Sequence, residues 1–151
     1  MVFHIGDHAS GAWMGLKAIE HSLLALDGFI EIDQLTRSVC NHYDVTKAID
    51  LSETILGHGS KRYGEVAPLI FMLADQGDSK STSIVNEGLN YISGMAKRLL
   101  EYKPNRLSII GGLSQLYLDR MDKSISDQFS PPLHSPEIGA LIYGRNQSAN
   151  T

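Results

Sequence analysis

The sequence contains a single cysteine, Cys40, among its 151 residues. One cysteine cannot form an internal disulfide, and no spacing of cysteines and histidines matches a zinc site. Scarce cysteine is typical of proteins of the reducing cytoplasm. We therefore expect a cytoplasmic chain with neither a disulfide framework nor a structural zinc.

Basic clusters and long hydrophobic runs are missing as well. The chain has 13 Lys and Arg against 17 Asp and Glu, which gives a net charge of -4. Because the sequence contains no cluster of Lys and Arg residues, it lacks the positively charged surface that binds nucleic-acid phosphates. The longest apolar run, Ala67 to Ala74, includes a proline and falls far short of the roughly 20 residues that span a bilayer. Met1 to Ile5 are too few for a signal-peptide core, so we expect neither nucleic acid nor a membrane as partner.

The length and the hydrophobic content of 42% suit one packed domain and are too small for two. We expect this domain to cover residues 1–145. The polar end of the chain predicts a disordered tail over residues 146–151.

Apolar residues recur at steps of three or four, which predicts a mostly helical chain. The first helix is expected over Ala12 to Leu26 and ends at Asp27-Gly28, because glycine suits the left-handed position after a helix. Its buried stripe is expected to be Ala12, Trp13, Leu16, Ile19, Leu23 and Leu26. Further helices are expected over Ile32 to Tyr43, Val45 to Leu56, Gly64 to Gln76, Ser79 to Tyr102, Leu113 to Met121 and Pro136 to about Tyr143.

Three residues are placed to start these helices. Asp44 would cap the helix at Val45 through its carboxylate, and Ser135 would cap the last helix. Pro68 would lie in a first turn, where a missing N–H costs little. The longest helix shows the clearest apolar stripe: Ile84, Val85, Leu89, Ile92, Met95, Ala96 and Leu99.

One segment, Arg106 to Ile110, predicts a buried strand halted by Gly111-Gly112. A lone strand cannot satisfy its own backbone donors and acceptors and needs neighbours in a sheet. Those neighbours could lie in a part of the protein outside this chain.

The Gly111-Gly112 turn is the first candidate ligand site. Glycines let a ligand approach the backbone closely, and the free N–H groups at a helix start favour a polar or anionic ligand. A tight turn with no ligand is the more common reading of an isolated Gly-Gly.

The loop before the first helix is the second candidate, because it carries one carboxylate, Asp7, between glycines. An ionised carboxylate can accept two hydrogen bonds from neighbouring sugar hydroxyls. Asp7 could equally cap the helix that starts near Ser10, and spacing alone favours the cap.

The side chains around this loop give no further site. His4 and His8 flank Asp7, but Gly6 argues against a helix that would align both on a metal. Trp13 and Met14 are expected in the core rather than as a stacking platform. The sequence contains neither a recognisable nucleophile–base pair nor a Gly-x-x-x-x-Gly-Lys-Ser/Thr phosphate loop.

Four motifs in order resemble the second half of the BadF/BadG/BcrA/BcrD-type ATPases, and within them the bacterial glucosamine and N-acetylglucosamine kinases. They are Ile5-Gly6-Asp7-x-x-Ser10-Gly11-Ala12-x-Met14-Gly15-Leu16, Ala67-Pro68 ahead of Gly77-Asp78, Ile109-Ile110-Gly111-Gly112-Leu113, and Pro131-Pro132 before Gly139-Ala140-Leu141. Together they cover nearly the whole chain. The resemblance implies an α/β fold of the ribonuclease-H-like, actin-like ATPase group, to which this mostly α-helical chain with one or few strands would contribute the carboxy-terminal domain.

The resemblance also implies ligands. Asp7, with Gly6 and Ser10, would line an amino-sugar pocket. Gly111, Gly112 and Leu113 would form the adenosine motif, and Glu65 in the loop after Tyr63 would approach the nucleotide on weaker grounds. None of these residues would be the catalytic base.

The family's amino-terminal half is not in the sequence. It carries both phosphate loops and the general-base aspartate, which position ATP and Mg²⁺ and activate a sugar hydroxyl for attack on the γ-phosphate. We therefore expect this chain to be part of an amino-sugar kinase and inactive alone, with the sugar, ATP and the missing ATPase domain as partners; a homodimer is left open. After Asp7 the family usually has an acidic or amide residue and then glycine, whereas this chain has His8 and Ala9.

Two alternatives are open at this stage. One is a non-catalytic truncated module or subunit that binds nucleotide or sugar. The other is the dehydratase-activator branch of the same group, which holds an iron–sulfur cluster between subunits; the single cysteine argues against it.

Overall fold

The computed structural model describes residues 7–148, which form nine helices and no strand longer than an isolated bridge. This confirms the prediction of a mostly helical chain. The chain divides into two compact units, Met1–Met95 and Ala96–Thr151, and each is described by itself. The predicted domain of residues 1–145 with a tail at 146–151 stays a prediction, although the last helix extends to Ser148.

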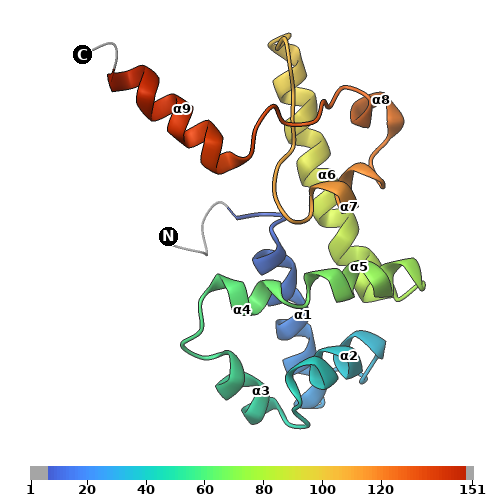
Figure 1. Cartoon of the computed structure of the whole chain (residues 1–151). Helices are drawn as coiled ribbons and strands as arrows, with labels where there is room; N and C mark the ends of the chain where they lie inside the picture. Colours follow the sequence, from blue (N-terminus) through green and yellow to red (C-terminus); the bar gives the residue numbers. More distant parts are fainter. Residues whose placement is uncertain (1–6, 149–151) are drawn as a thin grey trace. The chain divides into compact units, whose positions relative to one another are not determined.

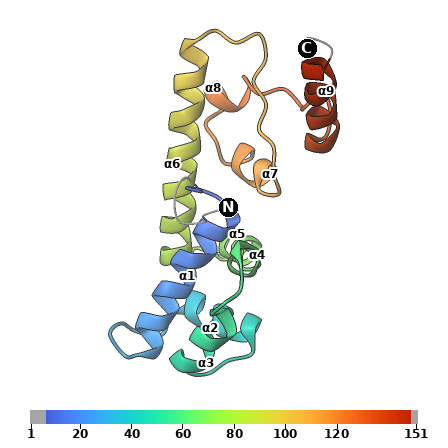
Figure 2. The same ribbon diagram turned by 90° about the vertical axis from the view of Figure 1, so that its left-hand side faces the viewer.

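The first unit is organised around helix α1 (Gly11–Leu26), which makes its most extensive contacts with the four helices that follow it. Figures 1 and 2 show these helices grouped around α1. They are α2 (Gln34–Tyr43), α3 (Ala48–Ile55), α4 (Ser60–Gly64) and α5 (Ala67–Asp75). The unit also includes most of the long helix α6 (Ser79–Glu101).

Helix α1 buries its small residues rather than the predicted stripe of large ones. Leu16, Leu23 and Leu26 are only partly buried, so this part of the prediction is wrong, although Ala12 and Ile19 are buried as expected. The buried face lets a neighbouring helix approach the α1 backbone. It consists of Ala12, Met14, Gly15, Ala18, Ile19, Ser22 and Ala25.

The closest approach lies between α1 and α4. A Cβ atom built on Gly15 would lie 1.7 Å from the carbonyl oxygen of Tyr63, a distance no real contact permits. Gly11 and Gly64 lie at the same crossing. Gly11 and Gly15 of the first motif therefore serve helix packing.

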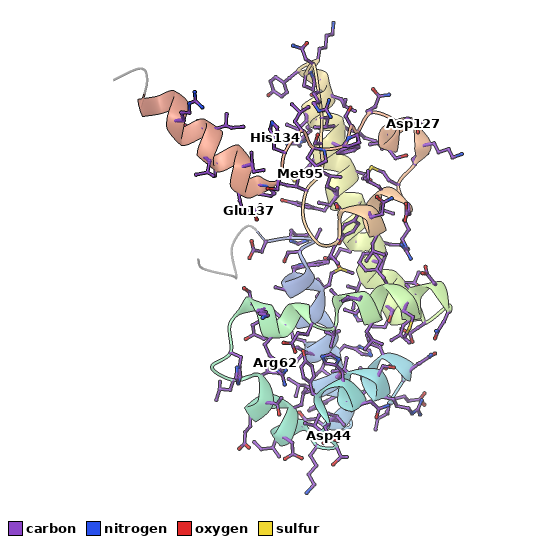
Figure 3. All side chains as sticks on the ribbon, in the orientation of Figure 1. Asp44, Arg62, Met95, Asp127, His134 and Glu137 are labelled. Atoms are coloured by element: carbon purple, nitrogen blue, oxygen red, sulfur yellow. The ribbon has the colours of Figure 1, made fainter. Side chains whose placement is uncertain are left out.

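The predicted helix starts are correct at Pro68, which lies in the first turn of α5, and wrong at Asp44. Asp44 ends α2 in the left-handed conformation (φ 55°) and does not cap α3, whose N-cap is Lys47. Aspartate tolerates this conformation better than most residues. Figure 3 labels Asp44 between the two helices.

The N-cap of α2 is Asp33, which ties this helix to α1. Asp33 Oδ1 accepts hydrogen bonds from the Thr36 backbone N–H and hydroxyl, both at 2.8 Å. Its other oxygen lies 2.7 Å from His21 Nε2 on α1. Burial alone would raise the pKa of Asp33, but the Thr36 hydrogen bonds and the His21 contact lower it overall below 3.8.

Replacing Asp33 by alanine is expected to lower the free energy of unfolding by about 1–2 kcal/mol at neutral pH, because the cap and the His21 contact are both lost. A carboxyl whose folded-state pKa is depressed stabilises the fold above its unfolded-state pKa, and this stabilisation disappears as the pH falls through the lowered value. The difference between wild type and Asp33→Ala should therefore shrink between about pH 5 and pH 2. Urea unfolding at several pH values measures it.

Asp33→Asn is the matched control, since asparagine caps helices about as well but carries no charge. It should retain much of the stability at neutral pH without the pH dependence. An equal loss in both variants at neutral pH would contradict the role assigned to the cap.

The second unit contains the end of α6 and the short helices α7 (Ser114–Leu118) and α8 (Lys123–Ser126). The predicted strand at Arg106 to Ile110 is wrong as a strand: the described residues form only one parallel bridge there, Leu107 with Phe129. Ser130 N donates to Leu107 O at 2.8 Å, and the Ser108 hydroxyl donates to Ser130 O at 2.8 Å. Without a further neighbour to pair with, the extended segment does not become a ladder.

Helix α9 (Pro136–Ser148) is the last described element and starts as predicted. The Ser135 carbonyl accepts a hydrogen bond from Gly139 N at 2.9 Å, which makes Ser135 the N-cap. The Ser135 side chain also lowers the pKa of Glu137, labelled at the start of this helix in Figure 3. α9 therefore begins where local capping chemistry directs it to.

The long helix α6 matches its predicted extent to within one residue. Ile84, Val85 and Ala96 of its predicted stripe are buried, whereas Met95 and Leu99 are nearly half exposed. None of the helices within residues 7–148 is both long and apolar enough to cross a membrane.

Candidate functional site

The first candidate site is the loop that enters α1. Ser10, and not Asp7, is the N-cap: its hydroxyl accepts from Trp13 N at 3.1 Å, which corrects the cap favoured by spacing alone. The Asp7 carbonyl accepts from Ser10 N at 3.0 Å. No described residue forms a hydrogen bond or ion pair with the Asp7 carboxylate. Asp7 therefore has both oxygens available, whereas Gly6 lies outside the described residues.

Ala9 holds this loop in a conformation that favours glycine. Its φ is 65°, and the residue is only 4% exposed. A residue with a Cβ costs roughly 1–2 kcal/mol in the left-handed region. Ala9 thus adopts a backbone conformation that glycine adopts more readily.

The loop is also held by a group of side chains that the sequence does not place together. The His8 ring centroid lies 4.6 Å from that of Trp13 and 4.8 Å from that of Tyr91. His8 Nε2 lies 3.6 Å from Glu87 Oε1, and Lys17 Nζ lies 3.2 Å from the same oxygen. We call these five residues the His8 cluster.

Trp13 belongs to the His8 cluster and is only partly buried, so its expected place in the core is wrong. Lys17 Nζ lies over its ring, 4.9 Å from the centroid. Met14, by contrast, is fully buried as predicted. The Trp13 ring lies instead between the His8 ring of the loop and the Lys17 ammonium of α1.

The second candidate site is the Gly111-Gly112 turn in the second unit. Gly111 has a φ of 122°, which only glycine adopts readily, and a Cβ on either glycine would meet nothing within 4 Å. The Gly111 carbonyl accepts from Ser114 N and from the Ser114 hydroxyl at 3.2 and 2.8 Å. The turn is thus fixed internally and open on its outer side. Its role as a ligand loop stays a prediction.

A cavity of about 420 Å³ lies directly beside this turn. It combines apolar and aromatic surface with hydroxyl, amide and carboxylate groups, as small-molecule sites commonly do. Gln115 Nε2 donates to Asp119 Oδ1 at 2.6 Å on its wall. The lining residues are Ile109, Ser114, Gln115, Leu118, Asp119, Ser126, Phe129, Ser130, Pro131 and Pro132.

Glu65, the weaker nucleotide candidate, lies in the first unit and has partners of its own. Its Oε2 accepts from Arg62 Nη1 at 2.7 Å and lies 3.7 Å from His42 Nε2. Burial, assisted by the Glu65 charge, raises the pKa of Tyr43 to about 12. The Tyr43 hydroxyl donates to Arg62 O at 2.8 Å, so this group anchors α4, where Figure 3 labels Arg62.

A metal site is not evident in the described residues, which contain no group of three or more His, Cys, Asp or Glu side chains placed to hold an ion.

Comparisons with known proteins agree with the resemblance. The chain is 27% identical to the glucosamine kinase GspK of Vibrio cholerae over 150 residues, which is 98% of this chain and 50% of the relative. It superposes with a TM-score of 0.79 and 24% identity on a Chromobacterium violaceum protein described as a "Putative N-acetylglucosamine Kinase", covering 91% of this chain and 47% of that one. No family model matches the chain.

The chain therefore spans about half the length of the relatives that it matches. The structural match extends over both compact units and confirms the predicted fold class. By sequence and by fold, the chain is similar over nearly its whole length to one half of a bacterial amino-sugar kinase.

Proposed function

We propose that this chain is the carboxy-terminal half of an ATP-dependent kinase of glucosamine or N-acetylglucosamine. The observation that carries the proposal is the alignment of 98% of the chain with half of a glucosamine kinase. Two open loops, one with a free carboxylate and one beside a cavity, lie within that alignment and are suited to the two substrates.

Asp7 is the proposed sugar contact. Its carboxylate is engaged by no described residue, so both oxygens can accept hydrogen bonds from vicinal hydroxyls. The Ser10 cap and the left-handed Ala9 fix the backbone on its C-terminal side. Gly6 would allow the sugar to approach the backbone closely.

The Gly111-Gly112 turn and the adjoining cavity are the proposed adenosine site. The N–H groups of Gly111, Gly112 and Leu113 have no acceptor among the described residues. Apolar walls from Leu118 and Phe129 would cover the faces of the base. Glu65 is retained only as a secondary nucleotide candidate.

The other half of the kinase would supply the remaining chemistry. By resemblance, it carries the phosphate loops, the catalytic aspartate and the ligands for Mg²⁺, so this chain alone is expected to bind without turning over. Its partners are then ATP, the amino sugar and an amino-terminal ATPase domain. The cytoplasm stays the predicted location.

Calorimetry of the purified chain with ATP and with glucosamine tests the proposal. We expect each ligand to bind at its own site and no sugar phosphate to form. Phosphorylation by the chain alone would contradict its proposed inactivity, and absence of binding by both ligands would contradict both site assignments.

A non-catalytic ligand-binding module is the second candidate, favoured by the same half-length match. Adding the non-matching half of the Vibrio cholerae kinase to the chain separates the two. Recovered sugar phosphorylation supports the divided kinase, whereas binding without any recovered turnover supports the module.

A substitution in the cavity wall tests the nucleotide assignment separately. Leu118→Trp should fill part of the space beside the Gly111-Gly112 turn and weaken ATP binding by about tenfold or more, a loss of ~1.4 kcal/mol. Glucosamine binding should not change, because Asp7 lies in the other unit. Calorimetry of both ligands measures this.

Leu133→Trp is the matched control, because Leu133 is 72% exposed and lies outside the cavity lining. Equal ATP affinity in the two tryptophan variants would place the nucleotide elsewhere.

A further inference from the structure

The His8 cluster fastens the loop that carries Asp7 to two helices distant in sequence. The His8 ring contacts Trp13 on α1 and Tyr91 on α6, and its Nε2 approaches Glu87 on α6. The side chain is nevertheless 43% exposed, so protons reach it freely. Asp7 is its direct neighbour in the chain.

We propose that His8 is a positioning residue for Asp7: its ring holds the loop against α1 and α6, and protonation of the ring tightens that hold and with it sugar binding. This inference rests on the sugar contact proposed for Asp7. It assigns a role to the residue at which this chain departs from the resembling family.

The charges around the ring give the direction of the effect. An imidazolium gains attraction to the Glu87 carboxylate and to the electron-rich faces of Trp13 and Tyr91. Lys17 opposes part of this gain, because its ammonium shares Glu87 Oε1.

The chain contains a single tryptophan, Trp13, so its fluorescence reports on this cluster alone. A protonated imidazole in contact with an indole quenches its emission. Wild-type emission should fall as the pH is lowered from about 8 to about 5, the range in which histidine titrates. His8→Phe, which keeps an aromatic ring, should abolish the transition, whereas His21→Gln should retain it.

Hydrogen exchange of the backbone amides at residues 7–9 measures the positioning itself. Protection factors should be higher in wild type than in His8→Phe. In wild type they should also rise as the pH is lowered. This rise should disappear in Glu87→Gln, which keeps the rings of His8, Trp13 and Tyr91. N-acetylglucosamine, which is uncharged across this range, should bind wild type more tightly at pH 6 than at pH 8 and should bind both variants without pH dependence.

A wild-type emission that does not titrate, or equal protection in wild type and His8→Phe, overturns the proposal. Circular dichroism checks that His8→Phe is folded, and Glu87→Gln provides the test if it is not. The fluorescence and hydrogen-exchange results can be as expected while no sugar binds at any pH. That outcome would overturn the sugar contact of Asp7 and its coupling to His8. It would leave His8 as the residue that fixes the loop.

Discussion

Gly15→Ala is expected to destabilise the first unit by about 3 kcal/mol or more, because the new methyl group meets backbone and has nowhere to go. Its Cβ would lie 1.7 Å from the Tyr63 carbonyl oxygen and 2.6 Å from the carbonyl carbon. A long side chain can rotate away from such a clash, whereas a carbonyl held at the end of a packed helix cannot. Helix α4 must therefore leave α1 or the unit must unfold.

Urea unfolding measures the effect, and Gly94→Ala is its matched control. Gly94 lies within α6, and a Cβ there meets nothing within 4 Å. Alanine at an open helical position is expected to add roughly 0.5–1 kcal/mol. A Gly15→Ala variant as stable as wild type would contradict the close crossing of α1 and α4.

Asp7→Asn is expected to weaken amino-sugar binding by about tenfold or more without affecting stability. Hydrogen bonds to a charged acceptor contribute roughly 1.5–3 kcal/mol, and the neutral amide loses much of this. The described structure does not use the Asp7 carboxylate, so the unfolding free energy should stay within about 0.5 kcal/mol of wild type. Calorimetry with glucosamine and urea unfolding together test both statements.

Asp27→Asn controls for the loss of one negative charge, since Asp27 is exposed at the far end of α1. It should bind the sugar as wild type does. A sugar affinity unchanged by Asp7→Asn would remove the first motif from the proposed site, while a large loss of stability would assign Asp7 a structural role instead.

The two candidate loops were predictable because glycine and carboxylate chemistry is local. Gly111 adopts a positive φ, which glycine tolerates, and the Asp7 loop enters α1 one residue before the expected start. The His8 cluster was not predictable. Glu87 and Tyr91 are about 80 residues from His8, and no local pattern links them to it.

The wrong prediction for the buried face of α1 also has its cause in contacts between distant parts of the chain. Large apolar residues were expected to face the core, yet the partner helix approaches so closely that only the small-residue face fits against it. The strand predicted at Arg106 to Ile110 is reduced to a single bridge at Leu107, because a strand needs pairing partners and no single segment specifies them.

The sequence by itself determined several helix ends, because prolines and glycines act within one or two turns: Pro68 lies in the first turn of α5, and Gly28 and Gly77 have the positive φ that favours a glycine after a helix. It did not determine the start of α3, because Asp44 ends α2 instead, and it did not separate α4 from α5. Only the tertiary structure decided which face of α1 is buried and which side chains hold the Asp7 loop. Those outcomes depend on how closely two backbones can approach and on contacts between residues far apart in the chain, and neither is encoded in any one segment.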